Sequence, residues 1–171
     1  SELIKKPGKL SRDEYDKIRK HPEIGYKLLR KLKAPDEVCQ AALMHHERCD
    51  GSGYPYHLKA HKISPFAKLT SIADVYDAMT STRVYRTCIC PFTAIWLFES
   101  DGILKYEPGY ITTFLQNVVS SYLGYHCRLS NGQEGNIIYI NRDMLSKPIV
   151  KCDEEFIDLA LEADLHIDCL L

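Results

Sequence analysis

Residues 45–55, HHERCDGSGYP in one-letter code, constrain this chain more than any other segment. Two adjacent histidines and a glutamate end an apolar run, and a sharp turn rich in glycine and proline follows them. A second segment, residues 72–79, places Asp74 and Asp77 among apolar residues at helical spacing. Imidazole and carboxylate groups are common ligands of transition metals. We therefore expect metal ligands on two packed helices, beside a loop that is shaped to meet a substrate or a partner.

The adjacency of His45 and His46 limits how they can bind metal. Successive residues of a helix point about 100° apart, so these two imidazoles cannot easily hold one ion in the same way. The pair suits a site with two or more ions, which Asp74 on the second helix could bind or bridge. His21, at a predicted helix start, could supply a third imidazole, and such ligands suit iron, manganese, zinc or nickel. The alternative for a single buried histidine is a core residue, and for Asp74 it is a buried ion pair.

Six short motifs follow one another along roughly residues 1–115. They are Lys6-Pro7-Gly8-Lys9-Leu10, His21-Pro22 with Gly25, His45-His46-Glu47, Asp50-Gly51-Ser52-Gly53-Tyr54-Pro55, Ile72-Ala73-Asp74 and Ser81-Thr82-Arg83-Val84-Tyr85-Arg86. Together they resemble the HD-GYP family, the bacterial metal-dependent phosphodiesterases that open cyclic di-GMP. The resemblance implies an HD-type helical bundle, a preference for iron or manganese among the possible metals, and hydrolysis of cyclic di-GMP to linear pGpG and GMP in signalling.

One family motif does not occur in these residues. The family's His-Asp dyad is expected upstream of Lys6, and the 171 residues contain no His-Asp dipeptide and no initiator methionine. We therefore interpret Ser1 as an internal start, and we expect the chain as given to be a weak or inactive catalyst. The alternative is a catalytically degenerate HD-GYP module that binds nucleotide or a protein partner. A third interpretation is hydrolysis of another cyclic dinucleotide by the same metal chemistry.

The resemblance and the ligand chemistry together assign the site residues. The expected metal ligands are His21, His45, His46 and Asp74. The last three are also expected to be catalytic. Arg83 and Arg86 follow the predicted ligand helix, and a guanidinium group can hold phosphate through two parallel hydrogen bonds. We expect both arginines to bind the substrate, with solvated surface charges as the alternative.

The loop after the two histidines carries the family's Gly-Tyr-Pro sequence. Its motif residues are Asp50, Gly51, Gly53, Tyr54 and Pro55. Glycine at positions 51 and 53 permits turns with positive φ. The resemblance implies that Tyr54 and Pro55 contact diguanylate cyclase domains, although both could also simply close the loop.

Two further acids flank the expected ligands. Glu47 either forms a hydrogen bond with a ligand histidine, a common way to orient such a ligand, or caps the loop. Asp77 lies three residues from Asp74 on the same helix face, and we expect it to have a structural role or to support a ligand.

Local signals predict helices in the first part of the chain. Ser11 and Glu14 stand at the spacing of a capping box. Asp36 is expected to cap a helix that ends in the two histidines, and Ser64 to cap a long helix that is apolar on most of its circumference and therefore buried. Further helices are expected to open at Pro22, Pro91 and Pro108.

The pattern changes after Gly124. Asn131-Gly132 lies between two apolar runs, which is a strong hairpin signal, and further short strand candidates follow. We expect a helical domain over residues 1–124 and a small β-rich appendage over residues 125–171. The predicted fold class is therefore mainly α, an HD-type helical bundle followed by a small antiparallel sheet. Trp96 is expected in the core.

Composition argues against several classes of function. A net charge of −1 gives no long-range field that would attract DNA or a membrane surface. No apolar run reaches the roughly 20 residues that a membrane span needs. The seven cysteines are odd in number and include no Cys-x-x-Cys pair, which is typical of reduced thiols in the cytoplasm, although Cys88-Ile89-Cys90 could be a fragment of a soft-metal site. The sequence does not reveal the oligomeric state, so a homodimer stays open.

Overall fold

The computed structural model describes residue 8 and residues 11–81, 88–102 and 104–171. The chain divides into two compact units, and each is described by itself. Unit 1 comprises Ser1–Cys88 and Leu104–Tyr110, and unit 2 comprises Ile89–Ile103 and Ile111–Leu171. None of the described helices is long and apolar enough to cross a membrane.

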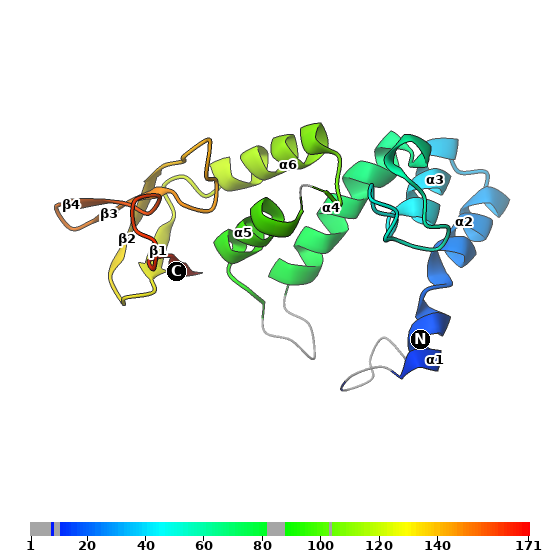
Figure 1. Cartoon of the computed structure of the whole chain (residues 1–171), viewed down its shortest axis with the longest axis horizontal. Coiled ribbons are helices and arrows are strands. Elements are labelled where there is room, and N and C mark those ends of the chain that lie inside the picture. The colour runs from blue at the N-terminus through cyan, green and yellow to red at the C-terminus, as the bar shows by residue number, and fades with distance from the viewer. Residues whose placement is uncertain (1–7, 9–10, 82–87, 103) are drawn as a thin grey trace. The chain divides into compact units, whose positions relative to one another are not determined.

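Unit 1 is helical (Figure 1). Its elements are α1 (Arg12–Ile18), α2 (His21–Lys31), α3 (Asp36–Met44), the short 3-10 helix η2 (Ala60–Lys62) and α4 (Pro65–Thr80). The predicted capping box of α1 is confirmed, because the Ser11 hydroxyl accepts a hydrogen bond from the Glu14 N–H and the Glu14 carboxylate accepts one from the Ser11 N–H. The predicted cap of α4 is confirmed as well, because the Ser64 hydroxyl accepts a hydrogen bond from the Ala67 N–H.

The predicted cap of α3 is wrong by one residue. Pro35 has an extended backbone and is the N-cap, whereas Asp36 is already the first helical residue. The Asp36 carboxylate therefore does not cap the helix, and it pairs instead with the guanidinium of Arg30 at 2.9 Å.

The core of unit 1 forms where α3 packs against both α2 and α4 (Figure 1). Cys39 of α3 and Ile72 of α4 are fully buried there. The opposite side of α4 is open, since 57% of Phe66 and 46% of Leu69 are exposed. The prediction that α4 is buried on most of its circumference is therefore wrong, because the unit covers only one side of this helix.

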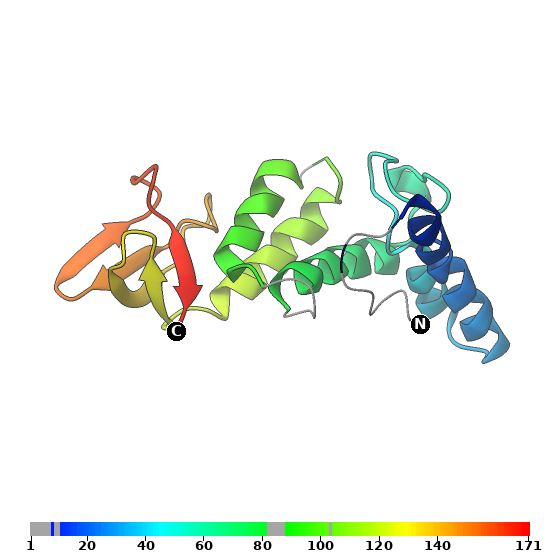
Figure 2. The same ribbon diagram turned by 90° about the horizontal axis from the view of Figure 1, so that it is seen from below.

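Unit 2 combines two helices with an antiparallel sheet (Figure 2). Its elements are α5 (Pro91–Asp101), α6 (Pro108–Ser120) from Ile111 onward, β1 (His126–Leu129), β2 (Glu134–Tyr139), β3 (Ile149–Cys152), β4 (Glu155–Asp158) and β5 (Ile167–Leu170). The strand order is β4-β3-β2-β1-β5. The hairpin predicted at Asn131-Gly132 joins β1 to β2, and Gly132 has the positive φ of 89° that such a turn favours. The predicted fold class, mainly α with a small antiparallel sheet at the end, is confirmed.

The core of unit 2 lies between α5 and the sheet, with α5 in contact with β5. Ile95 of α5, Ile137 of β2 and Val150 of β3 are fully buried. Trp96 follows Ile95 on α5 and is 52% exposed, so the prediction of a core tryptophan is wrong. Successive helical residues point in different directions, so Trp96 does not share the buried face of Ile95.

The change from helices to strands falls at the predicted position. Gly124 has a φ of 86° and lies between α6 and β1. The compact units follow a different division from the predicted one at residue 124, because α5 and most of α6 belong with the sheet.

Candidate metal centre

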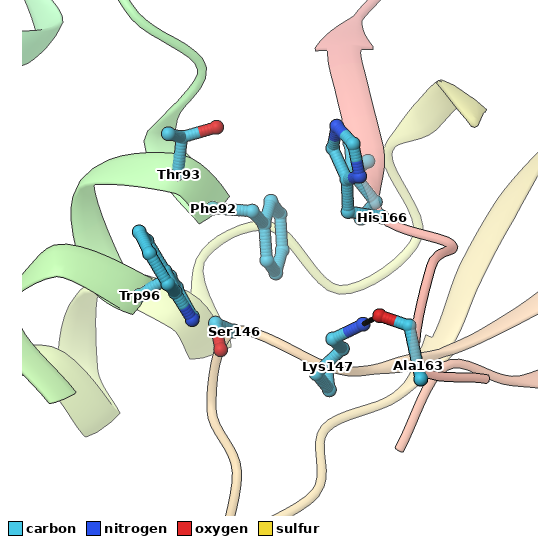
Figure 3. A pocket seen from close by; sticks show the side chains of 8 residues that line it. Phe92, Thr93, Trp96, Ser146, Lys147, Ala163 and His166 are labelled. Carbon is cyan, nitrogen blue, oxygen red and sulfur yellow. Dashed lines mark hydrogen bonds between the residues drawn. The ribbon is translucent and has the colours of Figure 1, made fainter. Parts of the chain in front are cut away.

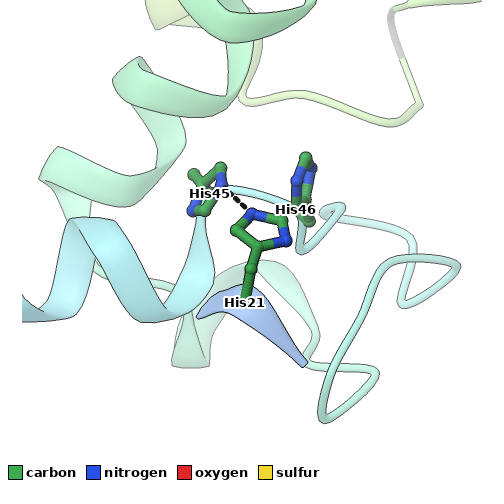
Figure 4. A group of neighbouring side chains, drawn as sticks. All are labelled: His21, His45 and His46. Carbon is green, nitrogen blue, oxygen red and sulfur yellow. Dashed lines mark hydrogen bonds between the residues drawn. The ribbon is translucent and has the colours of Figure 1, made fainter. Parts of the chain in front are cut away.

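Three histidines from two segments of the chain meet in unit 1 (Figure 4). His21 is the first residue of α2, His45 is the C-cap of α3, and His46 follows it. One ring nitrogen of each histidine lies within 4.8 Å of those of the other two. Among the described residues, this is a group of side chains that could hold a metal ion, as the sequence predicts.

Backbone carbonyls fix the orientation of two of the rings. Nδ1 of His21 lies 2.8 Å from the carbonyl oxygen of Ile18, and Nδ1 of His45 lies 2.9 Å from that of Ala42. A carbonyl oxygen can only accept, so each Nδ1 carries the proton and each Nε2 carries a lone pair. Metal-binding histidines are commonly held in this way by their other ring nitrogen.

The two Nε2 atoms of His21 and His45 face each other at 3.1 Å (Figure 4). A hydrogen bond between them would require one ring to carry two protons. A cation bound by both lone pairs needs no extra proton, and two nitrogens that each lie about 2.1 Å from one ion are commonly about 3 Å apart. The donor set therefore fits a bound metal ion.

The electrostatic environment keeps His45 and His46 neutral. Burial and the neighbouring imidazoles of His45 and His21, together with the Arg48 guanidinium, lower the pKa of His46 to about 3. The pKa of His45 is also lowered, chiefly by burial, although the carbonyl of Ala42 acts in the opposite direction. Only a neutral imidazole can bind a metal, so the site is ready to bind at neutral pH.

Asp74 of α4 completes the predicted set. One of its carboxylate oxygens lies 3.8 Å from Nδ1 of His46. The side chain of His46 is 20% exposed and that of Asp74 is 41% exposed, so His46 is mostly buried and Asp74 lies at the exposed edge of the cluster. The structure thus brings all four predicted ligands together, with three histidines in the cluster and Asp74 beside His46.

A stack of flat groups covers His46. The ring of Tyr54 stacks on the imidazole of His46 with centroids 4.6 Å apart, and the guanidinium of Arg19 lies 4.7 Å from the centre of the Tyr54 ring. Burial raises the pKa of Tyr54 to about 12, so its hydroxyl stays protonated. The motif tyrosine therefore packs against a predicted ligand histidine, and the Arg19 guanidinium lies close to the same tyrosine ring.

The motif loop is closely fitted to the chain that carries the histidines. A methyl group on Gly53 would lie 2.4 Å from the Arg48 nitrogen and 2.5 Å from the His46 carbonyl oxygen, so only glycine fits there. The Tyr54 N–H donates to the same His46 oxygen. Gly51 has a φ of 81°, which favours glycine.

Glu47 and Asp50 fasten this loop. The Glu47 carboxylate is buried and accepts hydrogen bonds from the N–H groups of Tyr56 at 2.7 Å and Leu58 at 2.9 Å. Of the two interpretations of Glu47, these contacts correspond to the loop cap. Asp50 accepts from the N–H and hydroxyl of Ser52, which lower its pKa.

The remaining predicted residues lie elsewhere. Asp77 accepts a hydrogen bond from the Ser81 hydroxyl at the end of α4, which is a structural contact. Arg83 and Arg86 lie outside the described residues.

Sequence reasoning missed two arginines. Arg48 donates from one guanidinium nitrogen to the carbonyls of His45 and Glu47 and to the hydroxyl of Ser71 on α4. It thereby connects the segment that carries His45 and His46 to α4, which carries Asp74. The signal for Arg48 was its place within residues 45–55, whereas nothing local distinguishes Arg19.

Comparison with known proteins agrees with this geometry. The HD domain family matches residues 1–107. A cyclic di-GMP phosphodiesterase of Pseudomonas aeruginosa, PA4108, is 34% identical over 151 residues, which are 87% of this chain and 36% of that protein. The cyclic di-GMP phosphodiesterase response regulator RpfG of Xanthomonas campestris is 43% identical over 119 residues, which are 67% of this chain and 31% of RpfG.

A solved structure supports the fold alone. Bd1817 of Bdellovibrio bacteriovorus, described as an HD-GYP-type protein, superimposes with a TM-score of 0.52 at 21% identity over 65% of this chain and 35% of that one. The chain spans about a third of the length of these relatives. The matched family, the histidine cluster and the Gly-Tyr-Pro loop lead to one conclusion: the chain belongs to the HD-GYP family of HD domains.

Proposed function

We propose that this chain is part of a metal-dependent phosphodiesterase that hydrolyses cyclic di-GMP to linear pGpG and GMP, and that these 171 residues, which contain no His-Asp dyad, are by themselves a weak or inactive catalyst. The observation that carries the proposal is the pair of Nε2 lone pairs of His21 and His45, which face each other at 3.1 Å beside neutral His46. Relatives that match most of the chain are named cyclic di-GMP phosphodiesterases, which supports the choice of substrate.

We further propose two or more metal ions, with iron or manganese favoured over zinc or nickel. The ligands form two pairs, His21 with His45 at 3.1 Å and His46 with Asp74 at 3.8 Å. Both distances suit two atoms that each bind one ion at about 2.1 Å. Mixed imidazole and carboxylate ligands suit all four metals, and the family resemblance favours the first two.

The roles of the chain's own groups follow from their positions. Bound metal ions lower the pKa of a bound water and neutralise charge on a phosphoryl group. The four ligands position those ions, and Tyr54 covers one face of His46. Arg83 and Arg86 are proposed to hold the substrate phosphates, because guanidinium groups carry charge and donors but cannot bind a cation.

The partner and the location are proposals as well. His46 stacks on the Tyr54 ring and the Arg19 guanidinium lies 4.7 Å from its centre, so we propose that a diguanylate cyclase domain meets the loop at Pro55 and the exposed Tyr56. Binding of such a domain by the wild-type chain, lost on replacement of Tyr56 by alanine, would test this contact. The cysteines of the chain are free, which supports a cytoplasmic location.

Metal analysis and hydrolysis, measured on the same samples, test the function. The purified chain and any longer natural form that contains it would be loaded with Fe(II) or Mn(II), and the metal content would be measured by mass spectrometry. Linear products from cyclic di-GMP would be separated by chromatography. His45→Ala and His46→Ala should lose metal and activity, whereas the control His61→Ala, at an exposed histidine of η2, should keep both. Unchanged metal content in the first two variants would reject the centre.

A second substrate has a specific observation in its favour. The relatives include 3'3'-cGAMP-specific phosphodiesterase 1 of Vibrio cholerae, which is 41% identical over 85 residues, half of this chain. The same assay with 3'3'-cGAMP as the competing substrate separates the two possibilities through the ratio of their kcat/KM values. Binding of either nucleotide without turnover in a metal-loaded sample of a longer natural form would favour the degenerate binding module, because these 171 residues alone are expected to turn over weakly or not at all.

A further inference from the structure

Unit 2 contains a cavity of about 340 Å³ that the metal centre does not use (Figure 3). It lies between α5, the loop before β3 and the segment that leads into β5. Its lining residues are Phe92, Thr93, Trp96, Ser146, Lys147, Ala163, His166 and Ile167. Small-molecule sites commonly enclose about 300–1,000 Å³, so this cavity suits a ligand of one or two rings.

Hydrogen bonds between side chains and backbone hold the walls in place. Glu99 of α5 accepts from the N–H groups of Leu145 and Ser146 and from the Ser146 hydroxyl, which fastens that loop to the helix. Lys147 donates to the carbonyls of Glu162, Ala163 and Leu165, which connects the loop before β3 to the segment that leads into β5. A cavity with fixed walls loses little entropy when a ligand binds.

The lining is mostly apolar. Phe92 is 2% exposed and Ile167 is 1% exposed, so they form a closed apolar floor. Trp96 stands beside them with 52% of its surface exposed, and Figure 3 shows the rings of Phe92, Trp96 and His166 around the space. A flat ring bound against Trp96 would bury apolar area that the protein alone leaves in water.

Polar groups and charge narrow the choice of ligand. The Thr93 hydroxyl and the His166 ring line the cavity and have no hydrogen-bond partner among the described residues. The Lys147 ammonium group gives the lining a positive charge, which disfavours a cation. A ligand that matches both features is flat, carries hydrogen-bonding atoms at its edge and is not positively charged.

We propose that this cavity binds an uncharged heteroaromatic ring of purine size, stacked against Trp96 and hydrogen-bonded at its edge to Thr93 and His166. The site lies in unit 2, whereas the histidine cluster lies in unit 1. The inference therefore goes beyond the proposed phosphodiesterase activity and does not depend on it.

The single tryptophan of the chain makes the test direct. A nitrogen-15 NMR spectrum of the whole chain contains one indole N–H signal, which belongs to Trp96. Guanosine and adenosine would be titrated against this signal, with ribose as the control that lacks the ring. We expect a saturable shift of the indole signal with at least one of the two nucleosides and none with ribose.

Matched variants distinguish the proposed contacts from general effects. Thr93→Val and His166→Ala should each weaken binding about five- to tenfold, as expected for the loss of one hydrogen bond. Their controls are Thr112→Val, at an exposed threonine of α6, and His126→Ala, at an exposed histidine of β1, and both should bind as the wild type does. Circular dichroism would confirm that all four variants fold.

Three results would overturn the proposal. The first is no saturable shift with either nucleoside. The second is equal binding by Thr93→Val, His166→Ala and their controls. The third is a shift of the indole signal that an aromatic peptide produces and the nucleosides do not, which would make the cavity a peptide site.

Discussion

Replacing Glu47 tests how the motif loop is held beside the predicted metal ligands. Glu47 is 2% exposed, and its carboxylate accepts two backbone hydrogen bonds, from Tyr56 at 2.7 Å and Leu58 at 2.9 Å. A hydrogen bond to a charged group contributes about 1.5–3 kcal/mol. Both bonds together therefore set an upper limit of about 3–6 kcal/mol.

The expected decrease in the free energy of unfolding lies toward the lower end of that range, because solvent can reach the partly exposed loop. Glu47→Ala should lower the free energy of unfolding by about 3 kcal/mol, and Glu47→Gln, which keeps one acceptor oxygen, by about half as much. The control is Glu23→Gln, since Glu23 accepts a hydrogen bond from the hydroxyl of the same Tyr56 at an exposed position. It should change stability by less than about 1 kcal/mol.

Denaturant unfolding followed by far-UV circular dichroism is the suitable assay. Fluorescence is not, because the single tryptophan, Trp96, belongs to the other unit. Metal content should fall together with stability, since the same loop places Tyr54 on His46. The reasoning fails if Glu47→Gln is as stable as the wild type, or if Glu47→Ala and Glu23→Gln cost the same.

The remaining predictions concern fit, protonation and thiol reactivity. Gly53→Ala should lower the free energy of unfolding by about 3 kcal/mol or more, because the new methyl group would overlap with backbone atoms that cannot easily move. Denaturant unfolding measures this change. The free energy of unfolding of the metal-free protein should fall by about 2 kcal/mol between pH 7 and pH 5. The reason is that His46 has a pKa of about 3 in the folded state, whereas in the unfolded state its imidazole binds a proton below about pH 6.5. Constant stability over that range would contradict it. Cys88 is exposed and should react quickly with a thiol reagent, whereas Cys127, which is fully buried with a pKa raised to about 11, should react only after unfolding; mass spectrometry of the labelled peptides checks both.

Features that depend on neighbours in sequence were predictable. The capping box of Ser11 and Glu14 spans four residues, and the Ser64 cap needs only the next turn of its helix. The turn at Asn131-Gly132 likewise requires no distant contact. Each of these signals acts within a few residues, so the sequence alone was sufficient to predict it.

Features that depend on tertiary placement were not predictable in this way. Arg48 bonds to Ser71, 23 residues further along, and Arg19 meets Tyr54 only because α1 lies beside the motif loop. The helical period of α5 could not show which face the sheet covers, so Trp96 was assigned to the core. Trp96 instead lines the cavity of unit 2 together with residues from the loop before β3 and the segment that leads into β5.

The directions of the His45 and His46 rings agree with the sequence prediction, but for a different physical reason. The expectation of separate roles for His45 and His46 assumed that helical geometry turns them apart, but α3 ends at Met44 and His46 lies beyond its cap. Their ring centroids are in fact 4.1 Å apart. The two imidazoles nevertheless face different partners, because Nε2 of His45 faces His21 and Nδ1 of His46 faces Asp74. These two directions, rather than a helical angle, support the proposed pair of ions. A variant that removes only Asp74 should therefore lose part of the bound metal, while the metal proposed to lie between His21 and His45 is retained.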